Sequence, residues 1–178
     1  CDGDLNPIHT HTGDYGWLRG VVQNDKLLYA KKSDDGYVLY MYDYNSHHHV
    51  CRLPVSVRSY DICTASHPAS GWFVLTDCKG ETMYMFTSDY QLHTQVEVRY
   101  LPYSPNGVCC IGSLIAVVRW RGKAIVWYNW AGEKVKGWTV DDIGVESYIN
   151  GVGYGGEGRI QMCTSTGYYT TKQHVFKV

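Results

Sequence analysis

Long hydrophobic runs are missing from this 178-residue sequence. The longest apolar stretches, such as residues 114–118, are strand-sized and fall far short of the roughly 20 residues that a membrane helix needs. The sequence also has no excess of charge of one sign, because its 16 basic and 17 acidic side chains give a net charge of -1. A content of 44% hydrophobic and 14% aromatic residues excludes a disordered chain. We therefore expect one soluble globular domain that does not enter a membrane.

Catalytic and cofactor-binding motifs are also missing. There is no G-x-S-x-G elbow, H-E-x-x-H pair or G-x-x-x-x-G-K-[ST] loop. The glycine-rich run 151–159 leads into a predicted strand, so no helix N-terminus follows it to hold a pyrophosphate. The histidines at 9, 11 and 47–49 show no convergence of the three or four ligands that zinc or copper requires. We predict a protein with no catalytic activity, no cofactor and no metal.

Seven cysteines occur without a C-x-x-C pair, at positions 1, 51, 63, 78, 109, 110 and 163. The odd number leaves at least one thiol unpaired. Most of them lie in strand-like runs, where a free cysteine behaves as a small hydrophobic residue. We expect mostly reduced structural thiols and a cytoplasmic protein. The alternative is a secreted domain in which Cys1 is bonded to a distant partner such as Cys163.

Short strand-like runs rich in Val, Ile, Tyr, Trp and Thr fill the sequence, and amphipathic helical periodicity is missing. Two such runs joined by a glycine-containing turn recur four times, over residues 26–44, 72–90, 113–133 and 158–178. The central apolar residue of the first run steps from Leu28 to Val74, Ile115 and Ile160 at intervals of 46, 41 and 45 residues. A strand-built repeat of this period predicts an all-β protein, a β-propeller of about four blades of four antiparallel strands. A sandwich of two face-to-face sheets is the alternative.

Residues 71–91, Gly71-WFVLTDCKGETMYMFTSDYQ, resemble an NHL-type β-propeller repeat in their order of Gly, apolar strand, Thr-Asp, polar turn and aromatic strand. Residues 113–135 are similar but lack the Asp at the end of the first strand. The resemblance spans most of residues 15–178. It implies a scaffolding or substrate-recruiting role beside other domains. A four-bladed hemopexin-like domain is an alternative, although this sequence lacks the acidic-aromatic consensus of that family.

The repeat divides the sequence into blades at about 15–60, 61–105, 106–147 and 148–178, within a single domain over residues 1–178. The last blade is short of an outer strand, which residues 1–14 would supply if they close the ring. Alternatively the chain is part of a larger propeller. In that case open sheet edges would assemble with another chain or with missing blades.

One face of such a propeller gathers the turns between second and third strands and the links between blades. We predict a ligand-binding site there that is moderately basic and aromatic. The most specific candidates for this site are Arg119, Trp120 and Arg121. Two guanidinium groups beside an indole can bind anions and can also stack on aromatic rings or bases. The other candidates are Lys123, Lys31, Lys32, Lys79, Arg58 and Tyr103.

The predicted function is a non-catalytic scaffold or recognition module that binds a partner protein through this face. Binding of RNA or another anion through the basic and aromatic turns is one alternative. A lectin-like sugar binder is another, with Trp17, Trp130 and Trp138 expected near polar turns and exposed.

Overall fold

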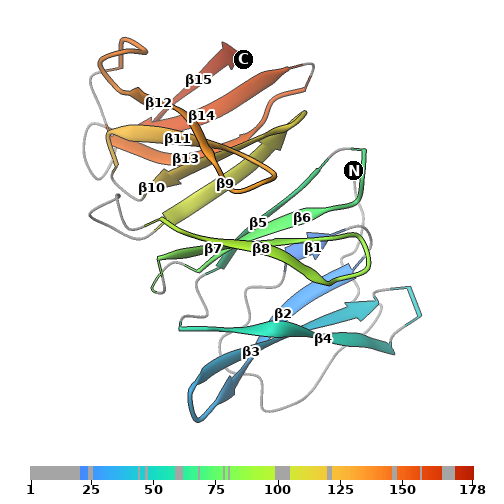
Figure 1. The fold of residues 1–178 in the computed structure, drawn as a ribbon. Helices are drawn as coiled ribbons and strands as arrows, with labels where there is room; N and C mark the ends of the chain where they lie inside the picture. Colours follow the sequence, from blue (N-terminus) through green and yellow to red (C-terminus); the bar gives the residue numbers. More distant parts are fainter. Residues whose placement is uncertain are drawn as a thin grey trace, which may run out of the picture.

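Four antiparallel β-sheets follow one another in chain order in the computed structural model (Figure 1). The structure describes residues 21–23, 26–43, 45–46, 48–58, 62–67, 69–77, 79, 81–98, 105–119, 122–145, 148–156, 158–165 and 171–178. Only the backbone is described for Val21–Gln23, residues 105–106, Arg119 and Thr171. Within these ranges no helix occurs, and thus none that is long and apolar enough to cross a membrane.

The first two sheets have four strands each, in the order of the sequence. The first sheet comprises β1 (Val21–Gln23), β2 (Lys26–Ser33), β3 (Gly36–Asp43) and β4 (His48–Val57). The second sheet comprises β5 (Ile62–Ser66), β6 (Phe73–Asp77), β7 (Thr82–Phe86) and β8 (Leu92–Glu97).

The third sheet repeats this order and the fourth has three described strands. The third sheet comprises β9 (Pro105–Ile111), β10 (Leu114–Arg119), β11 (Ala124–Asn129) and β12 (Lys134–Thr139). The fourth sheet comprises β13 (Tyr148–Tyr154), β14 (Arg159–Ser165) and β15 (Thr171–Lys177).

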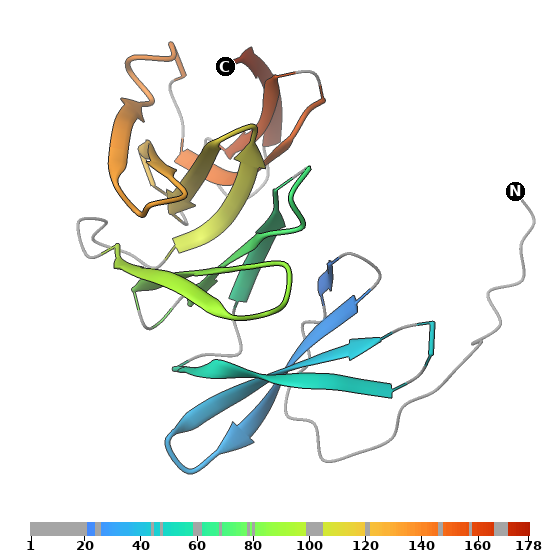
Figure 2. The same ribbon diagram turned by 45° about the vertical axis from the view of Figure 1, so that its right-hand side comes forward.

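The sheets lie side by side like the blades of a propeller, as both ribbon views show (Figures 1 and 2). The first strands β1, β5, β9 and β13 contact one another in sequence. Between neighbouring sheets lie three buried apolar clusters. Their largest side chains include Phe73 and Phe86 between the first and second sheets and Trp127 between the third and fourth. The prediction of an all-β, propeller-like fold is confirmed.

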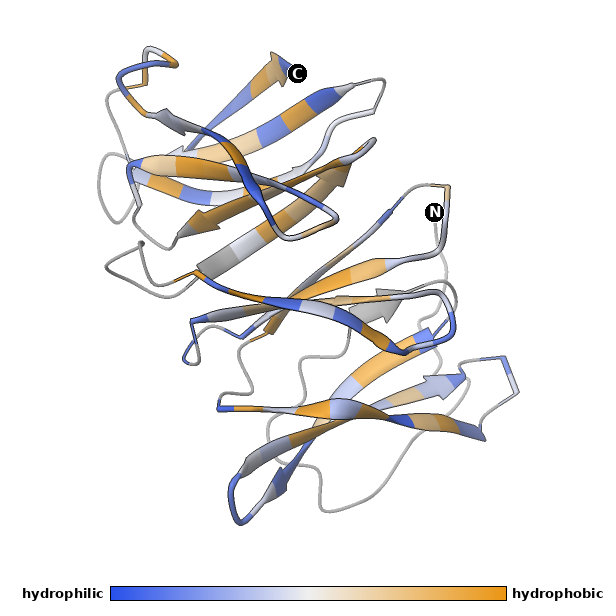
Figure 3. Ribbon diagram, in the orientation of Figure 1, coloured by the Kyte–Doolittle hydropathy of each residue, from blue (hydrophilic) through white to orange (hydrophobic). Residues whose placement is uncertain are grey.

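Burial on both sides explains the continuous apolar runs of the middle strands. Every residue of β6 is buried, and β11 is buried from Ile125 to Tyr128. A strand that packs against a neighbour on each side has no polar face to alternate with. The outer strands β8 and β12 do alternate with exposed residues, and polar colour follows them in Figure 3.

The strand register defines the equivalent positions of the four sheets. Each second strand has an apolar residue paired with an aromatic residue of the third strand, namely Leu27 with Tyr42, Phe73 with Phe86, Ile115 with Tyr128 and Ile160 with Phe176. The sequence repeat is therefore real, but the assignment of Leu28 and Val74 to this series was wrong by one residue. Both strands have consecutive buried residues there, so the pattern alone does not fix which one faces which way.

The third and fourth sheets share a local motif, Asn-Gly-Val, in their first strands. The register skips Asn106 in β9 and Asn150 in β13, so each sheet has a β-bulge just before the glycine. Gly107 is needed where it stands, because a Cβ there would lie 2.7 Å from Cγ2 of Val118 and 3.3 Å from the backbone nitrogen of Val152 in β13. The backbone of β13 in sheet four therefore packs close to β9 of sheet three at a residue without a side chain.

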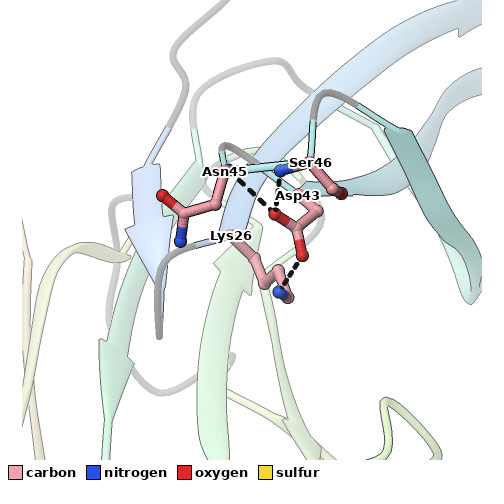
Figure 4. A network of polar contacts seen from close by, with 4 residues as sticks. All are labelled: Lys26, Asp43, Asn45 and Ser46. Carbon is pink, nitrogen blue, oxygen red and sulfur yellow. Dashed lines mark hydrogen bonds and ion pairs between the residues drawn. The ribbon is translucent and has the colours of Figure 1, made fainter.

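A polar network closes the end of the first sheet opposite its β2–β3 turn (Figure 4). Asp43 pairs with Lys26 across the sheet and accepts hydrogen bonds from the backbone N–H groups of Asn45 (2.8 Å) and Ser46 (2.9 Å). The hydrogen bond from Lys26, followed by those from the backbone, holds the pKa of Asp43 well below its usual value. The carboxylate thus fixes the β3–β4 turn in its ionised form.

Candidate recognition face

One end of the structure gathers the turns between second and third strands and the links from each sheet to the next. We call this end the loop face. Its described segments include the β2–β3 turn, the β6–β7 turn, the residues that follow β4 and the link between β12 and β13. Because every sheet runs in the same sense, each contributes the corresponding turn to this one end.

A buried carboxylate ties the first and second sheets together at the loop face. Asp77, at the end of β6, is 1% exposed. Its Oδ2 accepts the backbone N–H of Arg58 at 2.7 Å, and its Oδ1 accepts the backbone N–H of Lys79 at 3.1 Å. Burial, and then the negative charge of Asp77, raise the pKa of the neighbouring Tyr84. Asp77 therefore positions two of the predicted basic residues through their backbones.

A backbone hydrogen bond joins the third and fourth sheets at the same end, where the N–H of Ile149 donates to the carbonyl of Gly122 at 2.8 Å. Next to it, within the third sheet, the N–H of Val140 donates to the carbonyl of Lys123 at 2.8 Å. The Lys123 ammonium lies 5.7 Å from the centre of the Tyr148 ring, which belongs to the fourth sheet. Lys123 is therefore anchored at both its backbone and its side chain.

Five of the predicted basic residues lie on the loop face with exposed side chains: Lys31, Lys32, Arg58, Lys79 and Lys123. Arg119 ends β10 at this face, with only its backbone described. Trp120, Arg121 and Tyr103 lie outside the described residues. The role of all nine in binding stays a prediction.

Sequence reasoning missed a sixth cation on this face. Lys172 is the second residue of β15, is exposed and pairs with Thr164, so it stands at the loop-face end of the fourth sheet. Lys172 is equivalent to Val38 and Thr82 in the third strands of the first and second sheets. This equivalence could have identified Lys172, but it becomes visible only once the strand register is known. With Lys172, every sheet presents a lysine at the loop face.

Two acidic residues of the loop face, Asp77 and Asp142, are engaged in hydrogen bonds within the chain. Asp77 is buried and engaged, and Asp142 accepts hydrogen bonds from the backbone N–H of Thr139 (2.7 Å) and from its hydroxyl (2.8 Å). These bonds, the backbone one first, lower the pKa of Asp142. The exposed carboxylates of the described loop face are Asp34, Asp35, Glu97, Asp141 and Asp142.

A hollow of about 360 Å³ on the first sheet was also missed. Tyr29 and Tyr40 stack there with ring centres 5.4 Å apart, and the Tyr29 hydroxyl lies 2.7 Å from Nδ1 of His49. Lys31 and Arg52 bring two cations to its lining. The alternating Tyr29 and Lys31 were visible in the sequence, but their meeting with Arg52 depends on a bulged pairing of β3 with β4.

The remaining polar and aromatic candidates form no reactive centre in the described residues. No group of three or more His, Cys, Asp or Glu that could hold a metal occurs among them. The five described cysteines are free thiols, and burial raises the pKa of Cys109 to about 12 and that of Cys110 further. Cys1 and Cys78 lie outside the described residues, as does Trp17.

The two other tryptophans expected to be exposed are half-buried. Trp130 packs with His67 and Trp72, at ring-centre distances of 5.4 and 6.0 Å. Trp138 packs on Trp127 at 5.1 Å, and the Lys136 ammonium lies within 5 Å of both of these rings. These side chains join strands and sheets together, which accounts for part of the high aromatic content.

Comparison with known proteins places the fold but no family. No protein-family model and no curated protein matches the sequence. Among solved structures, hydrazine synthase of Kuenenia stuttgartiensis is similar at a TM-score of 0.69 and 14% identity, over 98% of this chain and 49% of that one. BBS1N, solved in complex with ARL6DN, is similar at a TM-score of 0.60 and 12% identity, over 92% and 52%.

A third similar structure is explicitly a propeller. The β-propeller domain of Cps50 (Swd1) from Myceliophteria thermophila matches at a TM-score of 0.60 and 12% identity, over 83% of this chain and 47% of that one. At these identities the likeness concerns the fold alone. It supports a β-propeller arrangement, whereas an NHL-type repeat in particular stays a prediction. The chain spans about half the length of these structures.

Proposed function

We propose that residues 1–178 form one propeller or partial-propeller domain with no catalytic activity, which binds a partner protein through the loop face. The observation that carries the proposal is the row of exposed cations that all four sheets present at this end: Lys31, Lys32, Arg58, Lys79, Lys123 and Lys172. A surface assembled from four separate sheets is broad, as protein interfaces are. Its charge favours an acidic segment of the partner.

One of the structures with a similar fold, BBS1N, was solved in complex with another protein, ARL6DN. In this chain the support comes from rigid presentation, because Asp77 fixes the backbones of Arg58 and Lys79, and Lys123 rests on Tyr148. Pre-ordered side chains lose less entropy on binding than mobile ones.

Site-specific photocrosslinking in cells tests the proposal. A photoreactive amino acid is placed at Lys79 or Lys123 on the loop face and, in parallel, at Ser88 or Ala131 in turns at the opposite end. We expect the loop-face positions to capture one and the same protein and the opposite positions not to capture it. Capture without preference for either end would contradict the proposal.

Charge reversal supplies the matched control for that experiment. Lys79→Glu with Lys123→Glu should lower the crosslinking yield, read at Arg58, by about tenfold or more if the cations contribute to recognition. Lys134→Glu with Lys177→Glu makes the same change at exposed positions of the opposite end and should leave the yield unchanged. Equal losses in both pairs would show a general effect of charge.

The same cations make single-stranded RNA a second candidate ligand. Lys31, Lys79, Lys123 and Lys172 could neutralise phosphates along the face, and binding to RNA would then fall steeply between about 50 and 200 mM salt. Fluorescence anisotropy with a labelled single strand measures this directly. Sugar binding has less support, since the described tryptophans are half-buried or buried.

A further inference from the structure

The hollow of about 360 Å³ lies on the side of the first sheet that points away from the second sheet. The register places Tyr29, Tyr40 and Arg52 in one row across β2, β3 and β4. Tyr29 is buried and belongs to the floor of the hollow, and Tyr40 is half-buried. The exposed residues of the lining are Lys31, His49, Val50 and Arg52. The hollow is therefore accessible, although the tyrosine at its floor is not.

An irregular strand pairing accompanies the hollow. The register between β3 and β4 shifts on both sides of the Tyr40–Arg52 pair, once between Met41 and Tyr42 and once between Val38 and Tyr40. The first shift has counterparts at the equivalent positions of the second and third sheets. The second shift has no counterpart in the printed pairings of those two sheets. Bulges of this kind re-aim side chains and are frequent beside functional sites.

The charge of the lining is of one sign. Lys31 and Arg52 bring two cations to the hollow, and the described lining contains no acidic residue. Neither cation has a carboxylate partner among the described residues, in contrast to Lys26, which pairs with Asp43 on the same sheet. Two like charges at one hollow repel each other, and an anion between them relieves this repulsion. A guanidinium group also matches the geometry of a carboxylate or a phosphate.

The rest of the lining offers aromatic and aliphatic surface. Tyr40 stacks on Tyr29 with ring centres 5.4 Å apart, and the His49 ring stands edge-on to Tyr40 at 6.3 Å. The Tyr29 hydroxyl lies 2.7 Å from Nδ1 of His49 and thereby orients the imidazole. Val50 is 41% exposed and adds aliphatic surface. Surfaces of this kind favour contact with a planar apolar ring.

We propose that this hollow binds a small aromatic anion, a single ring that bears a carboxylate or a phosphate group. Arg52 and Lys31 hold the anionic group, and Tyr40 and Val50 contact the ring. The volume of about 360 Å³ lies near the lower end of the range of about 300–1,000 Å³ that ligand sites occupy, which suits a ligand of one ring. The site is additional to the loop face, with which it shares only Lys31.

A titration of the 178-residue chain, followed by NMR of its backbone amides, tests the proposal. The probes are phenyl phosphate and benzoate, with inorganic phosphate and benzyl alcohol to represent the charge alone and the ring alone. We expect saturable shifts in residues 29–31 and 49–52 for at least one aromatic anion, with an affinity at least about tenfold higher than for either control probe. The absence of saturation up to about 10 mM of both aromatic anions, or equal affinity for inorganic phosphate, would overturn the proposal.

Two arginine variants show whether the anion is held at the hollow. Arg52→Gln removes the guanidinium of the lining and should weaken binding of the aromatic anion by about tenfold or more. Arg159→Gln removes an exposed guanidinium of the fourth sheet and should leave the affinity unchanged. An unchanged affinity in R52Q, or equal losses in both variants, would contradict the proposal.

Two valine variants place a carboxylate inside and outside the hollow. Val50→Glu brings a negative charge to the lining, so we expect no saturable binding of the aromatic anion. Val135→Glu makes the same change on β12 of the third sheet, at a similar exposure of 51%, and should leave binding unchanged. Binding retained by V50E would overturn the proposal. Circular dichroism and the thermal midpoint establish that the variants fold, and the arginine pair decides if V50E does not.

The result is independent of the proposed function. The crosslinking experiments concern Arg58, Lys79 and Lys123 on the loop face, none of which lines the hollow. Arg52→Gln should therefore leave the capture of a partner protein at Lys79 and Lys123 unchanged. Each proposal can thus fail without the other.

Discussion

The third and fourth sheets repeat the same local design and differ in what lies beyond them. Both begin with a bulged Asn-Gly-Val strand, and both carry an apolar–aromatic pair in their middle strands. On the side toward the next sheet, the third has Val118 and Trp127, each 0% exposed. At the equivalent positions the fourth has Cys163 and Val175, both exposed. Position in the row of sheets, more than strand propensity, decides which residues are buried.

The largest expected difference between the two sheets lies at the equivalent positions Trp127 and Val175. Trp127→Ala should lower the free energy of unfolding by about 3–5 kcal/mol, because it leaves a cavity between the third and fourth sheets. Val175→Ala should change it by no more than about 0.5 kcal/mol, because Val175 is 54% exposed. Urea unfolding followed by tryptophan fluorescence and circular dichroism provides both values.

The two glycines of the repeated motif sharpen the same comparison. Gly107→Ala places a Cβ 2.7 Å from Val118 and close to β13, so we expect a loss of about 1–3 kcal/mol. Gly151→Ala meets open space and should alter stability by less than about 1 kcal/mol in either direction. Similar losses for the two variants in thermal unfolding would mean that β13 does not cover β9.

A comparison of two aspartates tests how the loop face is held. Asp77→Ala removes a buried acceptor and leaves two backbone N–H groups without it, for an expected loss of about 1–3 kcal/mol. Asp142→Ala removes an exposed acceptor and should cost less. Chemical denaturation of both variants measures the difference in the free energy of unfolding. An equal loss of stability in the two variants would contradict the positioning role of Asp77.

The smallest expected effect concerns pH and the first sheet. The pKa of Asp43 is lowered in the folded state, so its contribution to stability is complete above the ordinary carboxyl pKa of about 4 and is lost as the pH falls. Asp43→Asn should therefore lower the melting temperature slightly at pH 7. The gap to the unaltered protein should narrow below pH 4; a gap that widens in acid would contradict this sign.

The sequence predicted the turns and the strand hairpins because glycine, aspartate and serine mark them chemically. It predicted the exposure of Lys31 and Lys79 for the same reason. It misplaced Leu28 and Val74 in the repeat, since strands buried on both sides show no alternation that would fix their facing. It missed the hollow at Tyr29 because Arg52 reaches it only through an irregular register in β4.

Distances between three labels test the row of sheets most directly. Spin labels attached through unnatural amino acids at Ser46, Ser88 and Ala131 mark the exposed turns that end the third strands of the first three sheets. Consecutive blades predict similar distances for 46–88 and 88–131, and a distance for 46–131 that exceeds each of them but is less than their sum. A 46–131 distance no longer than the other two would contradict the propeller arrangement and indicate sheets folded back face to face.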